Sequence, residues 1–113
     1  MTMSDGSGPS FQDLLQTAQR VQAELARVQA ELAQKSVEGS AGGGMVVATA
    51  NGRQQLLAVR IEREVVDPNE IPMLQDLVVA AVNQALAKAA ELAQQEMAKV
   101  TGGMNLNLGG LPF

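Results

Sequence analysis

A heptad spacing of apolar residues in the first third of the chain constrains its fold more than any other feature. The spacing alternates between three and four along the apolar positions Phe11, Leu14, Ala18, Val21, Leu25, Val28 and Leu32. Such a seam is typical of a helix that packs lengthwise against a partner helix, in the same chain or in another. Ser10 is a suitable N-cap, and Asp13 falls in the first turn, where the helix dipole favours acid. We predict a helix from Phe11 to about Gln34; the alternative for this seam is a helix that lies on its own domain.

The middle of the chain is predicted to form a small antiparallel sheet. Residues 45–50 and 54–62 have the composition of strands, and Asn51-Gly52 between them is a strong hairpin signal. If these two residues form a type I′ turn, Val46 lies opposite Leu57 in the paired strands. Two strands alone are marginal in water, so we expect a third strand at residues 36–41.

A second long helix is predicted over residues 73–100, after a proline-marked turn at residues 67–72. Its apolar arc, from Leu74 to Met97, is wider than one helix face, which indicates burial on two sides. Thr101-Gly102-Gly103 is expected to end it. The predicted order is α-β-β-β-α, an α+β fold with a small antiparallel sheet and two long helices.

The length of 113 residues fits one domain. We expect that domain at residues 10–103, between a flexible lead at 1–9 and a flexible tail at 104–113. The lead has neither the basic nor the apolar region of a signal peptide, and no apolar run approaches the roughly 20 residues of a membrane span. A cytoplasmic protein without a membrane partner is expected.

Composition excludes most catalytic chemistry. Without Cys or His there are no disulfides, thiolate metal sites or Ser-His-Asp triads. The glycine-rich residues 39–44 lack the spacing of a phosphate-binding loop, and Glu62, Glu64 and Asp67 have no partners to complete a metal shell. We predict a protein that is not an enzyme and has no metal, cofactor or small-molecule substrate.

Basic residues are scarce, and the net charge is −4, so contact with nucleic acid needs a local basic patch. Five basic side chains form stripes on the predicted helices: Arg20, Arg27 and Lys35 on the first, and Lys88 and Lys99 on the second. Two such stripes, if aligned, would contact phosphates from two sides. The alternative, which spacing alone favours, is local pairing with acids, as between Glu24 and Arg20 or Arg27.

Several segments together resemble the YbaB/EbfC family of nucleoid-associated proteins. Residues 35–47, KSVEGSAGGGMVV, are similar to the family's E-G-x-x-G-G-G-x-V core. Similar too are the Asn51-Gly52 turn, Val59-Arg60-Ile61, LQDLVVAAVNQA at 74–85, MAKVTGG at 97–103 and the closing GLPF at 110–113. The resemblance covers about residues 11–113.

The resemblance implies a tweezer-shaped homodimer that binds DNA without cofactor or catalysis, in nucleoid organisation or gene regulation. Family members often carry Lys on the strands where this chain has Val47, Leu57 and Ala58, which leaves the helical cations as candidates. We therefore predict phosphate contacts from Arg20, Arg27, Lys35, Lys88 and Lys99. Contacts to the DNA backbone and shape are expected, because the chain has almost no aromatic residues to stack on bases. The alternative is a protein-interaction adaptor of the same fold with weak or no DNA binding, which the acidic charge and the apolar outer strand favour.

Overall fold

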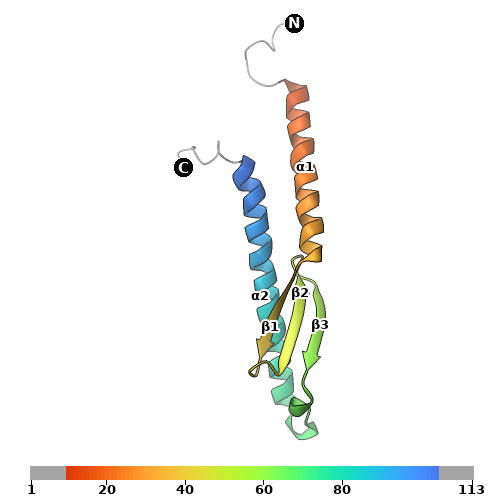
Figure 1. The fold of residues 1–113 in the computed structure, drawn as a ribbon, viewed down its shortest axis with the longest axis vertical. Helices are drawn as coiled ribbons and strands as arrows, with labels where there is room; N and C mark the ends of the chain where they lie inside the picture. Colours follow the sequence, from red (N-terminus) through yellow and green to blue (C-terminus); the bar gives the residue numbers. More distant parts are fainter. Residues whose placement is uncertain (1–9, 105–113) are drawn as a thin grey trace.

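The computed structural model describes residues 10–104, and its element order is the predicted α-β-β-β-α (Figure 1). The elements are α1 (Phe11–Gln34), β1 (Ser36–Ala41), β2 (Val46–Asn51), β3 (Leu56–Ile61), the short helices η1 (Arg63–Val65) and η2 (Pro68–Glu70), and α2 (Ile71–Met104). The predicted α+β fold with two long helices is confirmed. The flexible lead predicted at 1–9, and all but the first residue of the tail predicted at 104–113, lie outside the described residues.

Helix α1 begins at the predicted cap. The backbone N–H of Asp13 donates to Ser10 Oγ at 3.1 Å, and the Ser10 N–H donates to Asp13 Oδ2 at 3.3 Å. This reciprocal capping box satisfies two backbone donors that the first turn would leave without partners. Both predicted ends of the helix are confirmed.

The three strands form one antiparallel sheet in the order β1-β2-β3. The predicted third strand is confirmed as β1. Gly42, Gly43 and Gly44 all have positive φ in the connection to β2, a conformation that a side chain resists. The glycine-rich run is thus a tight strand connection.

The predicted register of β2 and β3 is wrong. Val46 lies opposite Ile61, not Leu57, and Ala48 lies opposite Val59. The connection is longer than two residues: the Asn51 N–H donates to the Gln55 carbonyl at 2.9 Å, and Gln54 has a φ of 62°. The Gln54 N–H donates to the Asn51 carbonyl at 2.9 Å, and a type I turn followed by a residue in the left-handed region is the usual form of a three-residue hairpin loop.

The physical reason lies in how α1 ends. The Gly52 N–H donates to the carbonyl oxygens of Leu32 and Lys35, at 2.9 and 3.0 Å. Asn51 Oδ1 accepts from the N–H groups of Arg53 and Gln55. The Asn-Gly pair therefore closes the last turn of the helix instead of forming a type I′ turn.

Helix α2 is longer than predicted, because it continues through Gly102-Gly103 to Met104. The prediction that this glycine pair ends the helix is wrong. Glycine costs about 1 kcal/mol in a helix but keeps its N–H donor, so it weakens the helix without the break that proline causes.

The core lies between α2 and the sheet. Ala81, Ala85 and Ala89, one turn apart on α2, are fully buried, as are Val46, Ala48 and Ala50 of β2. The small side chains let the helix approach closely, and a Cβ at Gly39 of β1 would collide with the α2 backbone at Ala81 and Ala85. Strand β3 lies at the far edge, and all six of its residues are exposed.

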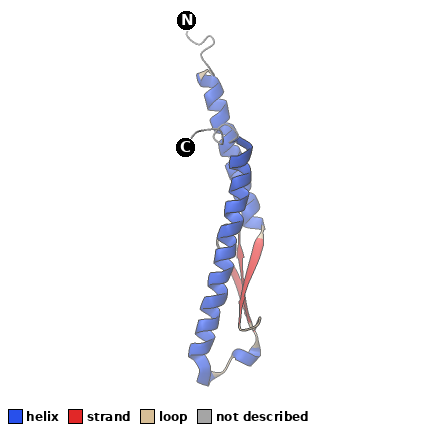
Figure 2. Cartoon of the chain, turned by 90° about the vertical axis from the view of Figure 1, so that its left-hand side faces the viewer, coloured by secondary structure: helices blue, strands red, loops and turns tan. Residues whose placement is uncertain are grey.

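The two long helices extend beyond the same end of the sheet (Figures 1 and 2). The radius of gyration is 22.2 Å, against about 13 Å for a compact domain of this length. Val28 and Leu32 of the heptad seam are buried, whereas Phe11 near its start is 74% exposed. Among the described residues, neither long helix has the apolar length needed to cross a membrane.

Candidate nucleic-acid interface

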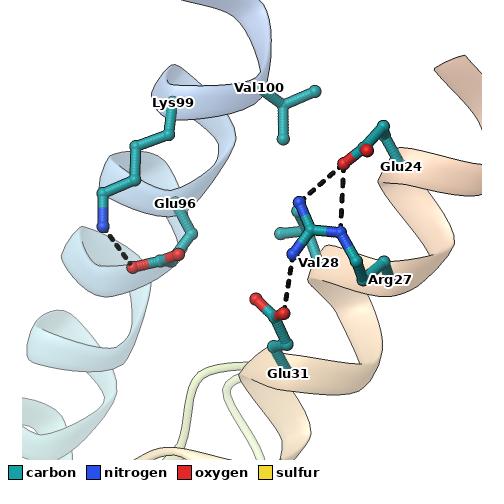
Figure 3. A pocket seen from close by; sticks show the side chains of 7 residues that line it. All are labelled: Glu24, Arg27, Val28, Glu31, Glu96, Lys99 and Val100. Carbon is teal, nitrogen blue, oxygen red and sulfur yellow. Dashed lines mark hydrogen bonds and ion pairs between the residues drawn. The ribbon is translucent and has the colours of Figure 1, made fainter.

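A groove of about 370 Å³ lies where α1 and α2 run side by side beyond the sheet (Figure 3). It is lined by Glu24, Arg27, Val28 and Glu31 of α1 and by Glu96, Lys99 and Val100 of α2. Five of these seven side chains are charged, three acidic and two basic. The groove therefore combines charges of both signs with apolar surface, to which Val28 and Val100 contribute.

Arg27 lies between two carboxylates on its own helix. Its Nε and Nη2 donate to Glu24 Oε1 at 3.0 and 2.6 Å, and its Nη1 donates to Glu31 Oε2 at 2.6 Å (Figure 3). Spacings of three and four residues place all three side chains on one helix face. The hydrogen bonds that Arg27 donates to Glu24, and then that to Glu31, raise the pKa of Arg27 above its ordinary value.

Glu96 holds two cations from different parts of the chain. Its Oε2 accepts from Lys99 Nζ at 3.1 Å, one turn along α2, and from Lys35 Nζ at 3.2 Å, at the junction of α1 and β1. The Glu96 side chain is only 11% exposed. The hydrogen bond from Lys99, and then that from Lys35, lowers the pKa of Glu96 against the opposing effect of desolvation.

The structure brings together three of the five predicted contact residues. Lys35 and Lys99 share Glu96, and Arg27 lines the same groove as Lys99. Arg20 lies about 10 Å nearer the start of α1, and Lys88 about 16 Å back along α2, both exposed. Local pairing, the alternative from spacing, is therefore correct for Arg27 and Lys99, whereas Lys35 pairs with Glu96 from 61 residues away in the sequence.

Three exposed arginines were not singled out from the sequence: Arg53, Arg60 and Arg63. Arg60 on β3 lies 4.0 Å from Glu62, and Arg53 follows the loop residue that packs on Leu32. The spacing of residues along the two long helices gives no information about residues outside these helices. The adjacency of Arg53 to Asn51-Gly52 is the one sequence signal that links it to a defined structural feature.

The site offers no obvious metal chemistry. Across residues 10–104, no group of three or more His, Cys, Asp or Glu side chains is placed to hold a metal ion. What the groove and its surroundings do provide is a set of ammonium and guanidinium donors, the groups that contact phosphate oxygens in protein–DNA complexes.

Comparison with known proteins adds to this geometry. A model of the YbaB/EbfC DNA-binding family matches residues 7–104. The chain belongs to this family. The resemblance inferred from the sequence is thereby confirmed.

Individual YbaB/EbfC relatives agree. The chain is 53% identical over 106 residues to a nucleoid-associated protein of Syntrophobacter fumaroxidans, covering 94% of this chain and 92% of the relative. It is 50% identical over 99 residues to one of Caldanaerobacter subterraneus subsp. tengcongensis, covering 88% and 89% of the two chains. A crystal structure of an uncharacterized protein from Helicobacter pylori has the same fold, with a TM-score of 0.65 at 16% identity over 86% of this chain and 98% of that one.

Proposed function

We propose that this YbaB/EbfC protein binds DNA as a homodimer, mainly through its phosphate backbone, and acts at the nucleoid in its organisation or in gene regulation. It does so in the cytoplasm without catalysis or cofactor. The observation that carries the proposal is the match of the DNA-binding family over residues 7–104, the whole described chain. The proposed contact residues are Arg20, Arg27, Lys35, Lys88 and Lys99.

Exposed apolar surface supports the homodimer. Phe11 and Leu14 at the start of α1, Val79 on α2 and the apolar residues of β3 are all exposed in the single chain. Soluble monomers rarely expose apolar patches larger than a few hundred Å². A second copy that covers part of the α1 seam or of the α2 arc would bury the portion of this surface that lies on the two helices.

Charge distribution supports backbone contact of modest strength. Two copies carry a net charge of −8, twice the −4 of one chain, so long-range attraction to DNA is absent. Binding then depends on the cations of the long helices. Contacts to phosphates orient a protein on the duplex and carry no sequence information by themselves.

Salt dependence of binding tests the proposal. The full chain is titrated against a random-sequence duplex by fluorescence anisotropy at several low salt concentrations. Each neutralised phosphate adds about 0.9 to the slope of log affinity against log salt, so Arg20 and Arg27 from two protomers predict a slope of roughly −3 to −4. Arg20→Glu with Arg27→Glu is expected to flatten the slope and weaken binding on all sequences equally. Arg60→Glu with Arg63→Glu is the control of equal charge; an equal loss there would refute the choice of helical residues.

The second candidate is a protein-interaction adaptor of the same fold. It is favoured by the pairing of Arg27, Lys35 and Lys99 with carboxylates, and by the exposed apolar strand β3. Absence of any salt-sensitive DNA binding by the wild type at low ionic strength would establish this candidate in place of the first.

A further inference from the structure

Three of the five proposed DNA contacts are already occupied within the protein. Arg27, Lys35 and Lys99, here called the paired cations, each donate to a carboxylate at 2.6–3.2 Å. Their acceptors Glu24, Glu31 and Glu96 are called the pairing carboxylates. Three positive and three negative charges meet here, so the set is neutral as a whole.

A DNA phosphate needs the same donors. Arg27 uses three of its five N–H donors, one each on Nε, Nη1 and Nη2, to bind Glu24 and Glu31. A phosphate that binds the Nε and Nη2 donors of Arg27 in the bidentate manner must therefore displace Glu24, and one that binds the two remaining N–H groups lies beside both carboxylates. It also meets the negative charge of whichever carboxylate stays nearby.

We propose that the pairing carboxylates compete with DNA phosphates for the paired cations and thereby set the affinity for DNA. This inference rests on the proposed function. It assigns a role in binding to three acidic residues that make no contact with DNA themselves. Their removal is expected to strengthen binding by more than their change in net charge explains.

The two helices contribute to this competition differently. The side chains of Glu24 and Glu31 are 44% and 45% exposed, so they are able to rotate into solvent when a phosphate arrives. Glu96 is largely enclosed between the two lysines and has no such freedom. It competes from a fixed position and holds Lys99, which lines the groove, near Lys35 at the end of α1.

Matched variants separate local competition from overall charge. The double variant Glu24→Gln/Glu31→Gln is compared with the double variant Asp76→Asn/Glu91→Gln. The second removes the same charge from exposed α2 residues for which no ion pair is found in residues 10–104. Glu96→Gln is compared with Glu91→Gln, five residues earlier on the same helix. All are measured as full chains on the random duplex at one low salt concentration, after thermal melting shows that they are folded.

The expected result is a gain in affinity of about threefold to tenfold for Glu24→Gln with Glu31→Gln beyond that of its control, the size expected for two exposed ion pairs. Glu96→Gln is expected to exceed Glu91→Gln in the same direction. Because Glu24 and Glu31 are only partly buried, their variants are expected to fold, and the test remains valid if Glu96→Gln does not. If the wild type binds the duplex and the variant gains no more affinity than its control, this inference is overturned and the proposed function is not. Absence of salt-sensitive binding by the wild type and every variant would overturn the proposed function with it.

Discussion

The backbone N–H of Gly52 donates to the carbonyl oxygen of Leu32 at 2.9 Å, so the β2–β3 loop closes the C-terminal end of α1. A Cβ on Gly52 would come within 2.6 Å of Leu32 Cδ2 and 2.9 Å of the Leu32 carbonyl oxygen. Leu32 is among the largest fully buried side chains of the described structure, so it has little room to move. Gly52 thus forms a close contact between the β2–β3 loop and the C-terminal end of α1.

Gly52→Val is therefore expected to destabilise the protein by about 1–3 kcal/mol, the usual cost of overpacking a core. The cause is the close approach to Leu32 and not the positive φ of a type I′ turn. Urea unfolding followed by circular dichroism measures the loss. Arg53→Val, one residue later and exposed, is the control, and a midpoint for Gly52→Val no lower than that of this control would refute the packing argument.

Gly39→Ala is expected to be at least as damaging. Its Cβ would meet backbone atoms of Ala81 and Ala85 on α2, and backbone cannot rotate aside as the end of a side chain can. The loss is expected to be about 2–3 kcal/mol or more, at the upper end of overpacking costs. Ser40→Ala gives the next, exposed residue of β1 the same alanine side chain by removing only a hydroxyl, and it serves as the control in the same urea experiment. Similar midpoints for the two variants would contradict the close contact.

A homodimer is expected in solution. Light scattering at micromolar concentration is expected to give twice the chain mass of 11.8 kDa. Leu25→Lys places a charge at the centre of the heptad seam, where it is expected to dissociate or unfold the dimer. Gln22→Lys, exposed and three residues earlier on α1, is expected to leave the mass unchanged. A wild-type monomer at this concentration would exclude the proposed assembly.

The stability of the protein is expected to decrease at acid pH because Glu96 becomes protonated. The Lys99 and Lys35 hydrogen bonds lower the pKa of Glu96 below its ordinary value of 4.5. A carboxyl group whose pKa is lower in the folded state than in the unfolded state stabilises the protein at pH values above its pKa in the unfolded state. That contribution disappears as the pH falls through the folded pKa. The stability difference between wild type and Glu96→Gln is thus expected to be full at neutral pH and to shrink below about pH 4.

Urea unfolding at a series of pH values measures this difference. Glu91→Gln, with the same change of charge on the same helix, is the control for general charge effects. A difference between wild type and Glu96→Gln that stays constant from neutral pH down to pH 3 would show that the lysine contacts do not stabilise the charged form of Glu96.

Features that depend on neighbouring residues in the sequence were predictable. The capping box of Ser10 and Asp13 and the heptad seam define α1 from Phe11 to Gln34, because caps and helical periodicity act over a few residues. Strand β1 was predictable for another reason, because two strands alone are marginal in water. The family was likewise recognisable from the sequence, since its motifs are spread over almost the whole chain.

Features that depend on contacts between distant segments were decided only by the tertiary structure. Asn51-Gly52 is a strong local turn signal, yet the Leu32 carbonyl takes the Gly52 N–H, and the register of β3 changes with it. Lys35 and Glu96 are 61 residues apart, so helical spacing had no means of pairing them. Sequence pattern determined which side chains share a helix face. The packing of α2 on the sheet and beside α1 determined which charges meet, because that packing sets the distances over which opposite charges attract.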